Sequence, residues 1–234
     1  MKLNELQERF RKLGDPSVAT TSARFFKTGV GEYGEGDCFL GIRVPKIRAF
    51  AKAQTSLPMD DLVCLLKSQY HEERLLALVL MVSFFEKADE QKRKDIYARY
   101  LANSAYVNNW DLVDSSAHQI AGGYLLDKNR DKLVELSLSS SLWERRIAII
   151  ATYHFIKRDQ YEDTLKIALN LLHDREDLIH KAVGWMLREV GNRDRNVEEA
   201  FLSKHYKSMP RTMLRYAIEK FDEQDRQSYL KGEK

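Results

Sequence analysis

The sequence predicts an all-α protein, a HEAT-like α-solenoid in which antiparallel helix pairs form a superhelix. Only 4 prolines and long stretches of Leu, Ala, Glu, Lys and Arg favour helices over strands. Strongly apolar helical segments then recur with starts 38, 33, 34 and 34 residues apart, at His71, Asn109, Leu142, Glu176 and Pro210. A helix pair with this period is typical of a solenoid, in which each pair buries its apolar face against its neighbours.

Each apolar segment is expected to form an inner helix, at 71–85, 109–126, 142–156, 176–190 and 210–221. Shorter amphipathic helices are expected between them, at 91–102, 130–138, 161–172 and 196–206. The glycine-bearing stretch 29–41 lacks the lysine and spacing of a phosphate-binding P-loop, so we interpret it as a connection before a helix that Pro45 starts. We expect one domain, residues 1–234; an irregular helical bundle is the alternative architecture.

Composition excludes several classes of protein. With 44% apolar and 31% charged residues, the 234-residue chain is typical of a soluble globular protein. No apolar run approaches the roughly 20 residues that cross a bilayer, so no membrane partner is expected. Cys38 and Cys64 are too few for a disulfide framework, and the six histidines lack ligand spacing. We therefore expect no metal, no cofactor and a cytoplasmic location.

The helix at 176–190 has two distinct faces. Its apolar residues follow helical spacing and form a core stripe: Ala182, Val183, Met186, Leu187 and Val190. Lys181, Trp185 and Arg188 lie on a different face. Because burying this tryptophan would also bury two cations, we expect Trp185 to be an exposed platform. The alternative is that Trp185 covers a seam between packed helices.

Cations also recur at near-equivalent positions of the repeats. Arg74, Arg146, Lys181 and Arg215 are 72, 35 and 34 residues apart, and Trp110 stands midway in the first interval. Such a row along a concave face suits a regularly charged polymer such as a nucleic-acid backbone. Ordinary solvated helix faces carry the same residue types. The net charge of +3 does not by itself distinguish such a face from one that binds a nucleic acid.

The stretch NNWDLVD, residues 108–114, contains two carboxylates with different expected roles. Asn108 or Asn109 is expected to cap the helix, which places Asp111 in the first turn, where a carboxylate favours the helix dipole. Asp114 lies a turn further in and shares a face with Trp110, four residues earlier. Asp114 has no evident structural reason for its position and is the candidate chemical group.

These segments resemble those of the AlkD-type DNA alkylation repair glycosylases, bacterial HEAT-like proteins that excise N3- and N7-alkylated purines. The resemblance covers nearly the whole chain and rests on the order and spacing of four stretches: FLGIRVPKIR (39–48), NNWDLVD (108–114), LWERRIAI (142–149) and KAVGWMLRE (181–189).

The resemblance implies roles for individual residues. It implies that Asp114 is catalytic, that Trp110 and Trp185 hold the sugar of the damaged nucleotide, and that Arg146 binds the backbone near the lesion. Arg43 stands where a relative carries glutamine and His154 where one carries lysine, and whether these two residues contact DNA as in the family stays open. With the cations of the proposed groove, the expected DNA-binding residues are Arg146, Lys181, Arg188, Arg43, Arg74 and His154.

The expected chemistry needs a single carboxylate. Ordinary glycosidases use two carboxyl groups, one of which protonates the leaving group. A purine alkylated at N3 or N7 already carries a positive charge and departs as a neutral base without an acid. Asp114 is then expected to stabilise the developing sugar cation and orient water, with cation–π support from the indoles. Activity is expected to fall only on the acid side of its pH profile.

The sequence therefore predicts a monofunctional alkylpurine DNA glycosylase, since no lysine stands out as a Schiff-base nucleophile for strand cleavage. Its expected partner is duplex DNA containing alkylated purines. It is expected to act as a monomer without an obligate protein partner, in a bacterial cytoplasm where it associates with the nucleoid. A solenoid that only binds DNA or protein, with a silent acidic site, is the alternative; release of free base distinguishes the two.

Overall fold

A computed structural model describes residues 2–234 and is all-α. Within this range there is no β-strand, and an isolated bridge joins Cys38 to Tyr70. The chain divides into two compact units, one ending at Ser116 and one beginning at Ala117. No helix of the described chain is long and apolar enough to cross a membrane. The single domain expected from the sequence stays a prediction.

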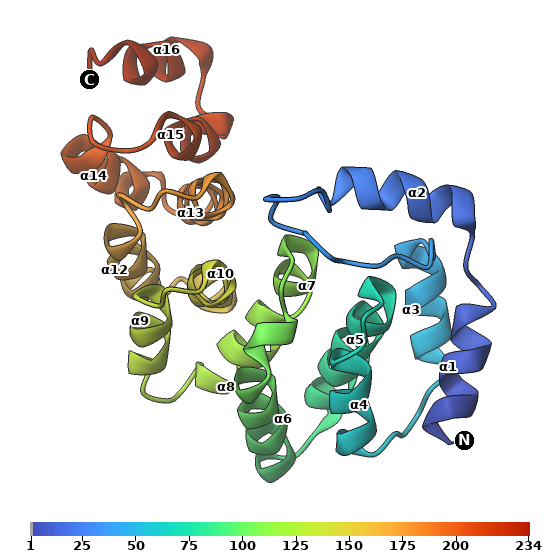
Figure 1. The fold of residues 1–234 in the computed structure, drawn as a ribbon. Coiled ribbons are helices and arrows are strands. Elements are labelled where there is room, and N and C mark those ends of the chain that lie inside the picture. The colour runs from blue at the N-terminus through green and yellow to red at the C-terminus, as the bar shows by residue number, and fades with distance from the viewer. Residues whose placement is uncertain (1) are drawn as a thin grey trace. The chain divides into compact units, whose positions relative to one another are not determined.

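The first unit is organised around one long helix, α5 (His71–Lys87), which contacts α3, α4, α6 and α7 (Figure 1). Residues Leu75 to Leu78, Leu80 and Met81 of α5 are 4% exposed or less, because neighbouring helices cover it on several sides. The other elements of this unit are α1 (Leu3–Arg11), α2 (Pro16–Phe25), α3 (Val44–Lys52), α4 (Met59–Leu66), α6 (Glu90–Ala102), a 3-10 turn (Ser104–Tyr106) and α7 (Trp110–Asp114).

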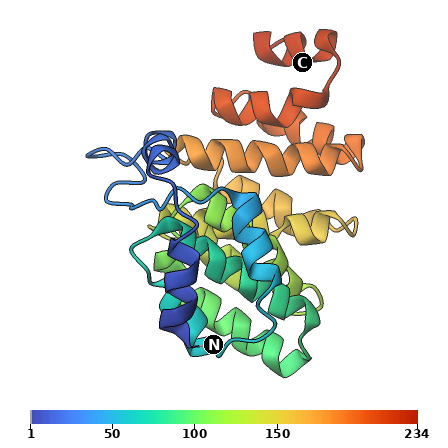
Figure 2. The same ribbon diagram turned by 90° about the vertical axis from the view of Figure 1, so that its right-hand side faces the viewer.

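The second unit stacks helix pairs in two layers. Figure 1 shows α9 (Asp131–Ser137), α12 (Glu162–Asn170) and α14 (Arg195–His205) in one layer, and α10 (Leu142–Ala151), α13 (Asp177–Gly191) and α15 (Arg211–Ala217) in the other. In Figure 2 the orange α13 lies along α15, its most extensive neighbour. The remaining elements are a π-helix, η2 (His118–Gly122), α8 (Gly123–Leu125), α11 (Tyr153–Ile156), η3 (Ile218–Lys220) and α16 (Glu223–Lys231).

The predicted faces of α13 are confirmed. Its core stripe of Ala182, Val183, Met186, Leu187 and Val190 is fully buried, whereas Lys181, Trp185 and Arg188 are partly exposed. Gly184 lies where α13 meets α15, and a Cβ atom there would stand 2.4 Å from the Met213 carbonyl oxygen. The absence of a side chain at this position is what allows the two helices to pack closely.

The predicted continuous helix at 109–126 is wrong. The segment divides into α7, the π-helix η2 and α8. The hydroxyl of Ser116 donates to the Leu112 carbonyl at 2.6 Å, one turn back, where α7 ends. Within the second unit, a Cβ atom on Gly122 would stand 2.3 Å from the Ala151 carbonyl oxygen. Hydroxyl back-bonding and close backbone packing therefore override the uniform apolar pattern.

The other predicted helices are present, although 142–156 divides into α10 and α11, and 210–221 into α15 and the 3-10 helix η3. The segments at 91–102, 130–138, 161–172 and 196–206 correspond to α6, α9, α12 and α14. Pro45 is in the first turn of α3, as predicted, because its missing N–H would have no helical partner there. The stretch 29–41 is a connection without helix. These agreements reflect strong helical periodicity and unambiguous start signals.

Candidate active site

The short helix α7 presents one polar face and one buried face. Asn109 is its N-cap, as predicted, and its side-chain oxygen accepts from the Trp110 amide at 2.8 Å. Leu112 and Val113 are fully buried and anchor the helix. Trp110 and Asp114 are half-buried and, being four residues apart, share the other face. The indole and the candidate carboxylate therefore lie on the same side of α7.

The carboxylate of Asp114 influences the buried hydroxyl of Tyr100. Burial raises the pKa of Tyr100, the hydrogen bond with Ser116 at 3.0 Å opposes this, and the negative charge of Asp114 raises the pKa further. Tyr100 is fully buried, so its phenol keeps its proton at neutral pH. This phenol is therefore a neutral group beside the candidate carboxylate and a poor source of protons for a substrate.

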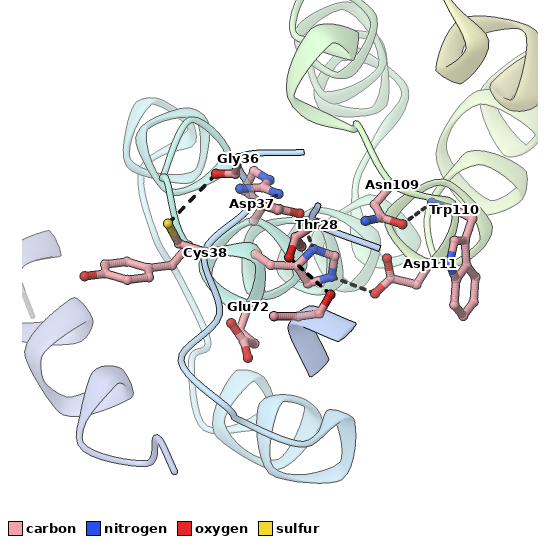
Figure 3. Close-up of polar contacts among 12 residues, drawn as sticks. Thr28, Gly36, Asp37, Cys38, Glu72, Asn109, Trp110 and Asp111 are labelled. Atoms are coloured by element: carbon pink, nitrogen blue, oxygen red, sulfur yellow. Dashed lines mark hydrogen bonds and ion pairs between the residues drawn. The ribbon is translucent and has the colours of Figure 1, made fainter. Parts of the chain in front are cut away.

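Asp111 is engaged by a residue that sequence reasoning did not select, His71. Nε2 of the histidine lies 2.8 Å from Oδ2 of Asp111, and Nδ1 lies 3.1 Å from Oδ2 of Asp37. Figure 3 shows Asp111 beside Trp110 at the start of α7, and Asp37 in the loop between α2 and α3. Asp111 thus has a specific partner in addition to its place in the first turn.

The three groups form a charged cluster. Burial acts to lower the pKa of His71, but the hydrogen bonds to Asp111 and Asp37 outweigh it and raise that pKa to about 9. Burial acts to raise the pKa of Asp37, but His71 and Arg74 lower it below its usual range. At neutral pH a buried imidazolium therefore lies between two carboxylates.

His71 is the first of four buried residues, HEER, that open α5. The Glu72 carboxylate accepts from the amides of Leu40, Gly41 and Ile42 at 2.9, 2.8 and 3.1 Å. Glu73 accepts from Arg11 of α1 at 2.6 Å and from the Ser68 hydroxyl at 2.6 Å. This HEER cluster attaches the preceding loop and α1 to the first turn of α5.

Arg74, the fourth residue of the cluster, does not suit the phosphate contact predicted from the sequence. Its side chain is 5% exposed and pairs with Asp37 at 2.5 Å. The same guanidinium donates to the backbone carbonyls of Ser68 and Gln69. A helix that is apolar on several sides is buried, which buries its first turn as well. Eight apolar residues, Leu75 to Val82, follow Arg74 directly, and this run was the available signal of burial. The DNA contact of Arg74 stays a prediction.

Aromatic side chains surround Trp110. The Phe26 ring stacks on the indole with centroids 5.5 Å apart, and Phe25 meets it edge-on at 6.0 Å. Phe25 is 63% exposed on α2. Arg43, the exposed N-cap residue of α3, lines with Phe25 an open cleft of about 440 Å³. The remaining lining residues are Ser17, Val18, Thr21 and Ser22. The first unit therefore carries one exposed cation of the predicted set, next to an exposed aromatic ring.

In the second unit, Trp185 is a partly exposed platform on α13. Its Nε1 donates to Glu189 Oε1 at 3.1 Å, one turn along the helix, and its ring lies 6.0 Å from Tyr153. Lys181 pairs with Asp177 at 2.7 Å and is 40% exposed, and Arg188 pairs with Glu219. Each of these cations has an exposed acidic partner that a phosphate could displace.

Arg146 differs from these surface cations. It is 5% exposed, and its guanidinium donates to the Leu178 carbonyl of the second unit. This bond links the inner helix α10 to the first turn of α13. Arg146 therefore has a structural partner in its own unit, and its contact with a DNA backbone stays a prediction.

His154 and His118 are both uncharged at neutral pH. Burial first, and then the charges of Arg158 and Lys157, lower the pKa of His154 to about 4. Burial first, then the charge of Lys157 and, once it is protonated in acid, that of His154, lower the pKa of His118 to about 4. His154 thus supplies no positive charge to a phosphate. Lys157, which sequence reasoning did not select, lies 4.4 Å from the Tyr153 ring centroid and is one of the cations of this region.

Within residues 2–234, no three His, Cys, Asp or Glu side chains gather as metal ligands would. The described chain is therefore an all-α protein with stacked helix pairs and with an indole and a carboxylate on one face of a short helix.

The sequence profile of the DNA alkylation repair enzyme family matches residues 6–221. The chain belongs to this family, and the predicted resemblance is confirmed.

The fold is also that of a solved structure described as a predicted DNA alkylation repair enzyme from Enterococcus faecalis. The two chains superpose with a TM-score of 0.68 and 16% sequence identity, over 90% of this chain and 97% of the other. At this identity the likeness shows the all-α fold and no residue role. Among curated proteins, none matches this chain.

Proposed function

We propose that this protein is a monofunctional DNA glycosylase that hydrolyses the N-glycosidic bond of cationic N3- and N7-alkylated purines in duplex DNA. The observation that carries the proposal is that Asp114 and Trp110 share the partly exposed face of α7, in a chain of the DNA alkylation repair enzyme family. A carboxylate beside an indole suits a sugar that becomes positively charged.

Asp114 would stabilise the oxocarbenium-like deoxyribose and orient the attacking water. The water proton is released as the C1′–O bond forms, and the alkylated purine leaves with the electrons of the C1′–N bond as a neutral base. Two groups close to Asp114 in sequence or space are poor proton donors at neutral pH: the raised pKa of buried Tyr100 makes it hold its proton, and His118, with a pKa of about 4, has already lost the extra proton. Both facts support a reaction that relies on the charge of the lesion itself.

The other residues would bind the DNA. The indole of Trp110 adds cation–π attraction to the developing sugar charge, about 1–2 kcal/mol when desolvated. Trp185 is proposed as a second aromatic contact, on the second unit. Arg43, Lys181 and Arg188 are proposed to contact phosphates, which fixes position without reading sequence. As a monofunctional glycosylase, the protein would leave the DNA strand uncut at the abasic product.

The test is chromatography of the bases released from methylated duplex DNA. We expect free 3-methyladenine and 7-methylguanine, with the sugar–phosphate backbone left intact until it is treated with alkali. Asp114→Asn serves as the matched variant, since it keeps the size of the side chain and removes its charge. Binding to the duplex without release of base would contradict the proposal and favour a scaffold that only binds DNA.

A further inference from the structure

His71, which has no role in the proposed reaction so far, bridges two acidic side chains near the candidate site. The imidazole is 2% exposed and its two nitrogens contact two acidic side chains from different segments, Asp37 in the loop before α3 and Asp111 in the first turn of α7. Asp111 adjoins Trp110 in the chain. One buried ring therefore joins the loop that leads to Arg43 to the turn that carries the candidate indole.

A second route runs through aromatic packing. The Phe26 ring lies 4.8 Å from the His71 ring and 5.5 Å from the Trp110 ring, which it stacks upon. Phe39 stacks on the imidazole at 4.7 Å and on Phe26 at 5.2 Å, so the three rings form one cluster. Phe26 thus contacts both the histidine and the indole, so a displaced imidazole would alter the packing of Trp110 even if Asp111 stayed in place.

We propose that His71 is a positioning residue for the glycosylase reaction: its protonated ring fixes the first turn of α7, and with it Trp110, against the loop that carries Asp37. This inference rests on the proposed function for its catalytic consequence. His71 itself would touch neither the sugar nor the base, and would act through Asp111 and Phe26.

Four charged side chains lie on or beside the His71 ring: Asp37, Asp111, Arg74 and Glu72. Asp37 faces it from the loop and Asp111 from α7. Arg74, one turn along α5, pairs with the other oxygen of Asp37. Glu72 is turned to the amides of residues 40–42. A neutral imidazole has one N–H and could donate to only one of the two carboxylates. The bridge between Asp37 and Asp111 therefore needs the protonated imidazolium.

The first arm of the test needs no turnover. Nitrogen-15 NMR would follow the ring nitrogens of His71 and the indole N–H of Trp110 between pH 6 and pH 10. The Trp110→Phe variant identifies the indole resonance, which it removes. We expect the ring to titrate with a midpoint near its raised pKa of about 9, and the Trp110 resonance to move with the same midpoint. A neutral ring at pH 7, or a Trp110 resonance that does not follow it, would overturn the inference.

The second arm measures single-turnover excision of 3-methyladenine over the same pH range. We expect wild-type excision to lose rate in a basic limb near the midpoint of His71. His71→Gln should lose about 10- to 100-fold in rate at pH 7, with near-normal DNA affinity, and should lack that limb. The matched control His173→Gln replaces an exposed histidine and should behave as wild type.

A His71→Gln protein that keeps both the wild-type rate and the basic limb would contradict the positioning role. If this variant does not fold, the NMR titration of the wild-type protein decides the matter. If the wild-type protein releases no base at all, the proposed function fails, while the coupled titration of His71 and Trp110 still tests the connection by itself.

Discussion

Asp111 and His71, 40 residues apart in the sequence, are joined by a 2.8 Å contact between Oδ2 and Nε2. This contact distinguishes the two carboxylates of α7. Asp111 balances a buried imidazolium, whereas Asp114 lies on the partly exposed face with Trp110. The first is a structural group and the second remains the candidate for chemistry.

Replacing each carboxylate in turn should separate these roles. Asp114→Asn should lower excision by about 100-fold or more and leave DNA binding and stability nearly unchanged. Asp111→Asn should lower the free energy of unfolding by about 2–3 kcal/mol, because it removes one of two counter-charges from a buried cation. Single-turnover excision and chemical denaturation measure the two effects. Wild-type excision by Asp114→Asn would contradict the assignment.

The stability cost of Asp111→Asn is larger than the sequence predicts. An aspartate in the first turn of a helix contributes about 0.5–1 kcal/mol through the dipole alone. The partner of Asp111, His71, lies in a different helix, and no local sequence pattern predicts their contact. The burial of the HEER cluster could be predicted only in part: the eight apolar residues after Arg74 indicate a helix buried on several sides. Which loop amides and acids would satisfy the cluster depends on tertiary packing.

By contrast, the faces of α13 were predictable. Helical spacing alone separates its buried stripe from Lys181, Trp185 and Arg188, because each residue's direction follows from the helix period. The break in 109–126 was not predictable from that pattern, since it depends on the approach of Gly122 to the Ala151 carbonyl. The shifted pKa of His154 likewise follows from burial and neighbouring cations, which the residue type does not reveal.

Exposed cations should give DNA binding its salt dependence. Arg43→Ala, Lys181→Ala and Arg188→Ala should each weaken binding to any duplex and reduce the slope of log affinity against log salt by roughly one, because each phosphate contact releases a counterion. His154→Gln is the matched control and should leave the slope unchanged, since His154 is neutral at pH 7. An unchanged slope in all three cation variants would remove the case for these contacts.

Glu198 on α14 should make stability depend on pH. It is 1% exposed, and burial first raises its pKa to about 8. Because the folded state then binds a proton that the unfolded state has lost above its ordinary pKa of 4.5, stability should fall as pH rises from about 4.5 to 8. Glu198→Gln, which mimics the protonated form, should remove this fall. Thermal unfolding at pH 5 and pH 9 measures it, and a variant less stable than wild type at pH 9 would contradict it.

His71 should add a second fall at higher pH. Its folded-state pKa of about 9 lies above its ordinary value of 6.5, so its contribution to stability is complete below about 6.5 and is lost as pH rises through 9. The Glu198→Gln background isolates this effect. The acid-only pH profile expected from the sequence is accordingly revised to include a basic limb that arises from positioning and not from a general acid. A flat stability between pH 7 and pH 10 in that background would contradict it.

The most direct test of the central claim, that excision relies on the lesion's own charge and a single carboxylate, is the rate of base release from duplexes that each carry one defined lesion. We predict release of cationic 3-methyladenine and 7-methylguanine, dependent on Asp114, and no release of the neutral bases 1,N6-ethenoadenine, 8-oxoguanine and uracil. Efficient excision of any of these neutral bases would show that the protein supplies an acid to the leaving group, and would contradict the account.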